Sequence, residues 1–337
     1  MISNRYRNDN KNGIPLNSTQ QEAKARVEQK IKNGTYTFEN VSCPICSNSD
    51  DFDTLAEKDR YGLSCTTVAC KRCGLLLTNP RMTQESYNQF YDREYRPLYS
   101  GSGTSTDFFF QRQHNSGIKI SNFIKEHSPI KDLSGKYVVE VGCGAGGILK
   151  AFKDLGATIT GLDLGSEYLK YGREKHGLNL ESGTIHSYNF EKAPDVIIYS
   201  HVFEHILDVE KEIERLKAIS HEKTIFYIEV PGVYSIDTVY SSDILSYLQN
   251  AHTYNFTLKT LKNLFAKHNI GLIYGDEFVH SLFSPNDTSI EKEIENIYEE
   301  EIAYLQKTEK RFNTLSFTIS QKIAILSMKI RRRLFKK

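Results

Sequence analysis

The sequence predicts an α/β protein with a parallel sheet, and three patterns support this prediction. Between about Phe108 and Phe283, apolar runs of strand length alternate with helical patterns, an order typical of βαβ units. A cluster of glycines follows the first run, as in loops that join a strand to a helix around a ligand. Two C-x-x-C pairs precede this region, and a long amphipathic pattern follows Pro285. We therefore expect an α/β domain with a cysteine-rich unit before it and helices after it.

The expected elements follow one another in a regular order. Strands are predicted at YVVEV, TITGLDL, VIIYS, TIFYIEV and GLIYGDEFVHSLF. Helices are expected to begin near Ile148, Glu167, Val209 and Leu258. An earlier helix is expected at 21–32, and the apolar positions between 290 and 326 predict a long amphipathic helix or a helix pair. These patterns divide the chain into a polar arm (1–40), a cysteine-rich unit with an aromatic linker (41–100), the α/β domain (101–284) and C-terminal helices with a basic tail (285–337).

The composition is that of an ordinary globular protein and excludes several classes. Of the 337 residues, 39% are hydrophobic and 25% are charged. A chain of this length is sufficient for about two domains. The net charge of +1 provides no global attraction to nucleic acid, and no nucleic-acid partner is expected. The first residues lack the apolar core of a signal peptide, and no apolar run is long enough to span a membrane. We therefore expect a cytoplasmic protein.

Four of the six cysteines form two pairs with the spacing of zinc ligands. Cys43 and Cys46 lie in CPIC, and Cys70 and Cys73 lie in CKRCG. Each short turn presents two thiolates to one tetrahedral ion, and four sulfur ligands leave no open position for a substrate. We therefore expect a structural zinc ion in a ribbon-like domain. A nucleic-acid-binding ribbon is disfavoured, because the intervening stretch is as acidic as it is basic.

The glycine cluster VVEVGCGAGG is compatible with two cofactors. Gly142, Gly144 and Gly147 complete the G-x-G-x-x-G of a dinucleotide site, and Asp163 stands where an acid would bind ribose in either case. Glu140 distinguishes the two. At an effective dielectric constant of about 20, a carboxylate about 5 Å from a phosphate charge costs roughly 3 kcal/mol. The ammonium and sulfonium groups of S-adenosylmethionine (SAM) would instead be attracted, so the loop favours SAM.

VVEVGCGAGG, GLDL and PDVIIYSHVFEHILD together resemble the class I SAM-dependent methyltransferases over about 108–283. The resemblance implies a Rossmann-like sheet and SAM as the cofactor. It also implies that Glu140, Gly142, Gly144 and Gly146 line the methionine end of SAM and that Asp163 binds its ribose. The segment 183–188 would pass near the adenine, although it lacks the acidic residue that many of these enzymes have there.

The segment SHVFEH, after the fourth strand, is expected to face the reacting methyl group. Ligands of open α/β sheets bind beyond the carboxyl edge, so Ser200 is expected beside the cofactor and Glu204 beside the acceptor. The segment lacks the N-P-P-Y of amine methylation and the Pro-Cys of cytosine-5 methylation, and its Glu-His pair resembles that of small-molecule and sugar methyltransferases. A hydroxyl acceptor benefits from a base, and His201 and His205 are candidates, with docking of the local helix as the alternative for His205.

The insertion after the fifth strand contains a third candidate base. Its AHTYNFT is similar to the E-H-x-x-Y-F-S element of sugar methyltransferases with an N-terminal zinc domain, in which the histidine acts as base. His252 occupies that position, but Ala251 replaces the glutamate of the carbon-methylating members and Asn255 replaces the tyrosine. The resemblance therefore favours methylation of oxygen. The alternative for His252 is a structural role in a loop that covers the site.

The order of zinc ribbon, aromatic linker and methyltransferase domain resembles enzymes of bacterial surface-polysaccharide and nucleotide-sugar pathways. This resemblance implies a sugar or glycan acceptor. In the linker, Tyr95 and Tyr99 could stack on a sugar and Arg96 could hold an anionic group; the alternative is a strap that packs the domains together.

The sequence also suggests two partners at its C-terminal end. The segment KIAILSMKIRRRLFKK is basic and amphipathic, which fits either peripheral contact with an anionic membrane or a solvated helix end. The amphipathic helix predicted before it could pair with the same helix of a second copy of the chain and form a homodimer. The alternatives to a sugar O-methyltransferase are a C-methyltransferase acting on a keto sugar and a non-catalytic binding module of the same fold.

Overall fold

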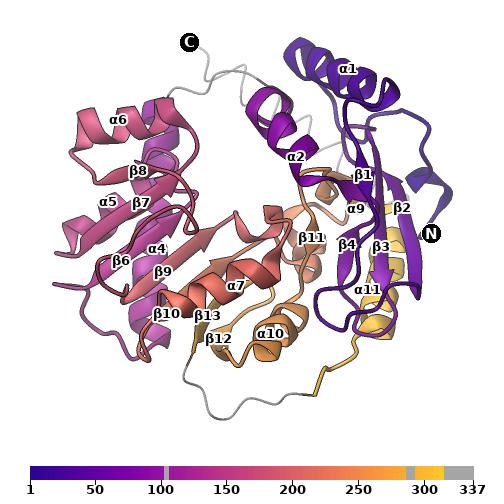
Figure 1. The fold of residues 1–337 in the computed structure, drawn as a ribbon. Coiled ribbons are helices and arrows are strands. Elements are labelled where there is room, and N and C mark those ends of the chain that lie inside the picture. The colour runs from indigo at the N-terminus through magenta and orange to yellow at the C-terminus, as the bar shows by residue number, and fades with distance from the viewer. Residues whose placement is uncertain (102–105, 286–292, 315–337) are drawn as a thin grey trace.

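The computed structural model describes residues 1–101, 106–285 and 293–314. The basic tail proposed to contact membranes lies outside these residues, as does much of the C-terminal amphipathic pattern. Among the described helices, none is long and apolar enough to cross a membrane. Figure 1 shows the α/β domain on one side and the N-terminal unit on the other, with the first and last described segments side by side.

The α/β domain is built on a seven-stranded sheet in the order β12-β13-β10-β9-β6-β7-β8. Its strands are β6 (Tyr137–Val141), β7 (Thr158–Asp163), β8 (Leu180–Ser182), β9 (Val196–Ser200), β10 (Ile225–Glu229), β12 (Gly271–Gly275) and β13 (His280–Ser284). The strands from β8 to β10 are parallel, whereas β13 is antiparallel to both of its neighbours. The α/β prediction is confirmed, but the sheet is mixed and not wholly parallel.

The difference arises in GLIYGDEFVHSLF, which was expected to be one strand and forms a hairpin. The carboxylate of Asp276 accepts hydrogen bonds from the backbone N–H groups of Phe278 and His280, and Val279 has a φ of 54°. An aspartate that holds a backbone N–H two residues ahead reverses the chain locally. The turn begins at Gly275-Asp276-Glu277, which separates two apolar runs that were read from the sequence as one strand.

Helices cover both faces of the sheet. One face packs on α4 (Thr106–His127), α5 (Gly147–Asp154) and α6 (Ser166–His176), and the other on α7 (Val209–Ala218) and α10 (Leu258–Lys267). Alternate residues of the central strands serve the two cores, as Val138 and Val139 of β6 do. The four helix starts expected from the sequence lie within one residue of those observed.

The N-terminal unit contains an antiparallel sheet in the order β11-β4-β3-β2. Its elements are α1 (Ser18–Lys32), β1 (Phe38–Glu39), β2 (Phe52–Lys58), β3 (Ser64–Cys70), β4 (Leu76–Thr78), β5 (Arg81–Met82), α2 (Gln84–Phe90), η2 (Tyr91–Tyr95, a π-helix) and α3 (Arg96–Ser100). Strand β11 (Tyr254–Asn255) comes from the insertion after β10 and pairs with β4. This pairing joins the cysteine-rich unit to the α/β domain.

The two ends of the described chain also pack on this unit. Tyr6, in the segment expected to be a polar arm, is fully buried and donates its hydroxyl proton to Glu309. Glu309 belongs to α11 (Tyr298–Phe312), which lies beside β2 and β3 in Figure 1. Leu305 of the same helix joins a core with Leu55 and Leu76. The N-terminal segment is therefore part of the folded unit.

Candidate functional site

The loop after β6 has a backbone that only glycine accommodates easily. Gly142, Gly144 and Gly146 have φ angles of 70°, 54° and 76°. A Cβ atom at Gly142 would lie 2.4 Å from Val202, and one at Gly146 would lie 2.9 Å from Leu178. The loop leads directly into α5, and its N–H groups at Gly142 and Cys143 donate to the carbonyl of Leu162 at the end of β7. The positive φ angles agree with the tight glycine turn expected after this strand.

Asp163 ends β7 and is tied to the glycine loop. Its carboxylate accepts hydrogen bonds from the N–H of Gly144 at 2.9 Å and from the N–H of Gly165 at 2.6 Å. The next residue, Leu164, is 74% exposed. An exposed leucine beside an acid at the carboxyl edge offers an apolar surface for a flat ring. Leu164 was not predicted as a site residue, although its position directly after the acid is a usable signal.

Glu140 is buried inside the domain, with 2% of its surface exposed. Burial, and secondarily the charge of Asp163, raises its pKa well above the usual range, while the backbone of Leu149 in α5 opposes the shift. One carboxyl oxygen, Oε2, has no hydrogen-bond partner. This carboxyl group, which was expected to line the methionine end of SAM, is therefore buried and favours its protonated form until a cationic group comes near.

Helix α4 covers the glycine loop from the other side. Gln113 donates to the carbonyl of Cys143 at 3.0 Å and accepts from the N–H of Gly147 at 3.4 Å. Phe109, one turn earlier, lies close enough that a Cβ atom at Gly144 would be 3.2 Å from its ring. Neither residue was predicted from the sequence, because nothing in their local pattern marks α4 as a neighbour of the loop.

At the end of β9, His201 lies between two glutamates. Its Nδ1 is 3.8 Å from Glu204 Oε1, and its Nε2 is 3.3 Å from Glu229 Oε1. Partial burial lowers the pKa of His201, but both glutamates outweigh this effect and raise it well above the usual value. The side chain is 56% exposed, and its φ is 56°, a left-handed conformation that is uncommon outside glycine. Ser200, before it, donates its hydroxyl proton to Glu229 at 2.9 Å.

Behind His201, three side chains converge in the interior. Glu204 Oε1 is 3.6 Å from His205 Nε2 and 3.9 Å from His252 Nε2. The side chains of Glu204 and His252 are 2% and 3% exposed, and that of His205 is 13% exposed. Burial, as the largest cause, lowers the pKa of both histidines, which favours neutral imidazoles. The structure therefore brings His205 and His252 together with Glu204 but covers them, while His201 remains open to solvent.

The aromatic linker lies against this cluster. Tyr91, Tyr95 and Tyr99 stack in sequence, with ring centroids 4.3 and 5.6 Å apart. Tyr91 and Tyr95 meet the ring of His205 edge-on, at 5.9 and 5.8 Å. Tyr99 is 53% exposed at the outer end of the stack. The stack therefore extends from the surface to the histidines.

Arg96 lies elsewhere, although it follows Tyr95 directly. Its guanidinium carbon is 4.2 Å from the ring centroid of Tyr168 in α6. A Cβ atom at Gly165 would be 2.4 Å from Arg96 Nη2 and 3.0 Å from Asp163 Oδ1. Arg96 therefore borders the Asp163 loop, whereas Tyr95 borders the histidines. The linker contacts both halves of the candidate site.

Glu229 also contacts a histidine that the sequence did not single out. His280 Nε2 is 3.6 Å from Glu229 Oε1, and its Nδ1 is 2.9 Å from Asp276 Oδ2. The hydrogen bonds with Asp276 and Glu229 raise the pKa of His280 to about 9. His280 lies far along the chain from β9, so only the pairing of β10 with β13 brings it to this site.

The raised pKa of His280 predicts a pH-dependent contribution to stability. Because the folded-state pKa exceeds the usual 6.5, the stabilisation is complete below about pH 6.5 and is lost as the pH rises through about 9. The free energy of unfolding should therefore differ most between wild type and His280→Gln below pH 6.5, and the difference should shrink above pH 9. Urea unfolding at several pH values measures this. A constant difference at every pH would show that His280 contributes packing alone.

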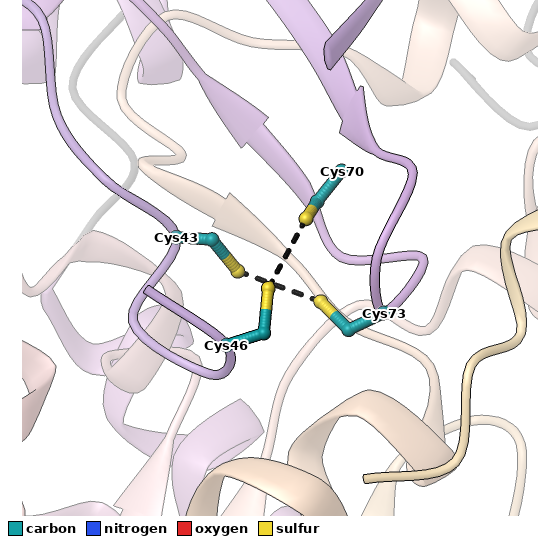
Figure 2. A group of neighbouring side chains, drawn as sticks. All are labelled: Cys43, Cys46, Cys70 and Cys73. Carbon is teal, nitrogen blue, oxygen red and sulfur yellow. Dashed lines mark hydrogen bonds between the residues drawn. The ribbon is translucent and has the colours of Figure 1, made fainter. Parts of the chain in front are cut away.

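The four paired cysteines converge within the N-terminal unit (Figure 2). The sulfur atoms of Cys43 and Cys73, and those of Cys46 and Cys70, are 3.4 Å apart, and all four lie within 4.8 Å of one another. Tetrahedral zinc with Zn–S bonds of about 2.3 Å places its sulfurs about 3.8 Å apart. The donor set therefore fits a zinc ion.

Comparison with known proteins finds methyltransferases that are similar to the α/β domain. Residues 112–273 match the sequence profile of a family described as a methyltransferase domain. An uncharacterized methyltransferase of Staphylococcus carnosus is 26% identical over 36% of this chain and 58% of its own length. A ubiquinone biosynthesis O-methyltransferase of Photorhabdus laumondii is 30% identical over 31% of this chain and 45% of its own. The match confirms the prediction of a methyltransferase domain.

Similar solved structures are more distant. The plantazolicin methyltransferase BpumL, solved with SAH, is 16% identical, with a TM-score of 0.46 over 67% of this chain and 88% of that chain. CalS10, an amino pentose methyltransferase from Micromonospora echinaspora, is 18% identical, with a TM-score of 0.31 over 40% of this chain and 55% of that chain. The chain spans about half the length of the two curated relatives named above.

Proposed function

We propose that this chain, which carries a SAM-dependent methyltransferase domain at residues 112–273, transfers a methyl group from SAM to a hydroxyl group of a sugar. The observation that carries the proposal is the meeting of two sets of residues at the carboxyl edge of one sheet. The glycine loop and Asp163 form one set, and the histidines after β9 form the other. A donor held by the first set lies beside an acceptor held by the second.

The residues around the loop fit the cofactor. The left-handed glycines leave room for close approach of a ligand, and Asp163 has the charge to accept hydrogen bonds from ribose hydroxyls. Glu140 Oε2 has no hydrogen-bond partner and suits a nearby cation. Such a cation would stabilise the carboxylate form of Glu140. SAM, when bound, supplies an electrophilic methyl group on a positively charged sulfur. Ser200 ends β9 and His201 follows it at the same edge of the sheet.

In this proposal the chain aligns the acceptor and manages its proton. A sugar hydroxyl loses its proton as its oxygen bonds to the methyl carbon, and the carbon–sulfur bond breaks with its electron pair remaining on sulfur. Alignment of the two reactants supplies most of the rate enhancement of such a displacement. A base within reach contributes about 100-fold or more. His201 is exposed, while His205 and His252 present ring nitrogens to Glu204 just behind it.

The sugar assignment draws support from the aromatic linker and from the resemblance to sugar methyltransferases. Tyr95 and Tyr99 form a stack that runs from the surface to His205, and aromatic faces suit the apolar faces of sugar rings. Arg60 adds a cation 5.6 Å from the ring centroid of Tyr99, where it suits an anionic carrier such as a nucleotide diphosphate. The place of this chemistry would be the synthesis of surface polysaccharides.

Methylation at carbon is the second candidate, and one observation favours it. The sequence lacks a glutamate beside His252, since Ala251 stands there. In the folded chain, Glu204 occupies the space near His252 Nε2, at 3.9 Å. A carboxylate next to this histidine is therefore present, supplied by a different segment. Mass spectrometry of the product distinguishes the candidates, because a carbon-bound methyl group survives the ether cleavage that removes an O-methyl group.

The His252→Ala variant tests the acceptor half of the site. Turnover should fall at least about tenfold, because a buried imidazole near the acceptor is lost, while the affinity for SAM should stay unchanged. The measurements are labelled methyl transfer from SAM across nucleotide sugars and isolated glycans, together with calorimetry of SAM binding. Equal losses of turnover and SAM affinity would assign His252 to a covering role. Absence of SAM binding by the wild-type protein at millimolar cofactor would contradict the proposed function itself.

A further inference from the structure

We propose that Glu204, His205 and His252 bind a divalent transition-metal ion, in a site separate from the four cysteines. The three side chains come from two segments, the turn after β9 and the insertion before β11, and each offers one ligand atom. The ion would hold the oxygen of the acceptor, a role that rests on the proposed methyl transfer. The binding of the ion itself does not depend on that function.

The positions of the ligand atoms fit one ion. The three atoms lie within 4.8 Å of one another, and Glu204 Oε1 is 3.6 and 3.9 Å from the two Nε2 atoms. Metal–ligand bonds of about 2.0–2.2 Å place neighbouring donors about 3.0–3.5 Å apart. The two distances from Glu204 to the histidine nitrogens therefore exceed this range by a few tenths of an ångström at most.

The hydrogen bonding of His205 orients a lone pair towards Glu204. Its Nδ1 is 2.9 Å from the carbonyl oxygen of Ala251, which can only accept, so Nδ1 carries the proton. In the neutral ring, Nε2 then has a lone pair and faces a carboxylate oxygen. This is the arrangement of metal-binding histidines, whose other ring nitrogen commonly donates to a carbonyl.

The same situation holds at His252. The side-chain amide nitrogen of Gln249 contacts His252 Nε2, and an amide N–H can only donate, so this nitrogen also presents a lone pair. The orientation of the amide is set by Arg60, whose Nη2 donates to Gln249 Oε1 at 2.7 Å. Entry of an ion requires the amide of Gln249 to move aside, and its oxygen can keep Arg60 as a partner during this movement.

Three acceptor atoms thus lie close together in the interior, where the amide of Gln249 donates to His252 Nε2 and His201 Nδ1 lies 3.8 Å from Glu204 Oε1. Glu204 is 2% exposed, and its second oxygen, Oε2, is buried with no hydrogen-bond partner. A buried acceptor without a partner is costly, and Glu204 Oε2 is such an acceptor. A cation at their centre satisfies all of them. Two imidazoles and one carboxylate suit zinc, iron, manganese or cobalt.

Such an ion would differ from the zinc expected at the cysteines. Three protein ligands leave coordination positions for water or a substrate oxygen, whereas four sulfurs leave none. A hydroxyl group bound to the ion loses its proton more readily, to water, and its oxygen then bonds to the methyl carbon. The carbon–sulfur bond breaks with its electrons on sulfur, leaving a neutral thioether. No oxidant or reductant is required.

The test is the metal content of the full-length protein. Metal-depleted protein is loaded with Co²⁺ alone, dialysed and measured by mass spectrometry of the elements and by absorption. Wild type should hold two ions per chain, one with strong sulfur-to-cobalt charge-transfer bands and one with weak ligand-field bands alone. Glu204→Gln should hold one ion and keep the charge-transfer bands. His205→Ala should behave in the same way, and it decides the test if Glu204→Gln does not fold.

His221→Asn is the matched control. This histidine also lies beside a carboxylate, with Nε2 3.8 Å from Asp195 Oδ1, but no third ligand joins the pair among the described residues. It should keep both ions. A single ion in wild type, or equal content in wild type and both cluster variants, would overturn the proposal. If wild type holds one ion and still transfers methyl groups, the proposed function stands and the second metal site is refuted. If it holds two ions and does not bind SAM, the metal site stands and the proposed function is refuted.

Discussion

The Cys70→Ser variant is expected to bind no zinc at the four cysteines, where a structural ion is predicted, and to lose the folded N-terminal unit as a result. Structural zinc contributes about 10–16 kcal/mol of binding free energy in small zinc peptides, and a lost thiolate removes a large share. Cys70 ends β3, and its N–H donates to Leu75 just before β4. We expect the midpoint of thermal unfolding to fall by more than about 10 °C. Metal analysis and circular dichroism measure the two losses.

The loss should extend to the acceptor side of the site. Strand β4 pairs with β11, which lies just after His252, and the unit also carries the aromatic linker. Methyl transfer should therefore disappear even where SAM binding by the α/β domain persists. Cys65→Ser is the control, since Cys65 is buried beside Thr78 and outside the four-cysteine group. It should keep zinc, and retention of zinc and of normal melting by Cys70→Ser would refute the structural role.

The Asp163→Ala variant is expected to bind SAM at least about 100-fold more weakly. Hydrogen bonds to a charged group contribute about 1.5–3 kcal/mol each, and 1.4 kcal/mol corresponds to a factor of ten in affinity. The carboxylate also holds the N–H groups of Gly144 and Gly165, so its removal loosens both loops that form the cradle. Isothermal titration calorimetry with SAM measures the affinity.

Asp195→Asn is a suitable control for this substitution. Asp195 also accepts a backbone hydrogen bond, from Tyr137 at 2.8 Å, but at the start of β6, on the opposite edge of the sheet. It should change stability and leave SAM affinity within a factor of about two. Unchanged affinity in a folded Asp163→Ala protein would remove Asp163 from the cofactor site and weaken the SAM assignment.

Much of the domain could be predicted from local pattern. The helices that follow the parallel strands begin where the sequence indicated, because an apolar stripe with a helical period must face the sheet. The hairpin of β12 and β13 could not be predicted in this way. Its turn depends on the side chain of Asp276, and the apolar residues on either side of that turn look like one continuous strand.

For Glu140, the sequence predicts the position of a carboxyl group but not its burial. The sequence places a carboxyl group in the strand before the glycine loop, and this remains correct. Whether that group is open to a ligand or buried depends on what covers it. Because neighbouring strands and α5 bury Glu140, its pKa rises, and its role becomes conditional on a bound cation.

The sequence by itself determined the glycine loop, the acid after the second parallel strand and the four cysteines, because each consists of residues within one turn or two. Only the tertiary structure decided how the remaining residues are divided between the two halves of the site. Tyr95 and Arg96 are neighbours in sequence yet lie against His205 and Tyr168 respectively. Glu204 and His252 are far apart in sequence yet meet, because strand pairing and burial act between segments that no local pattern connects.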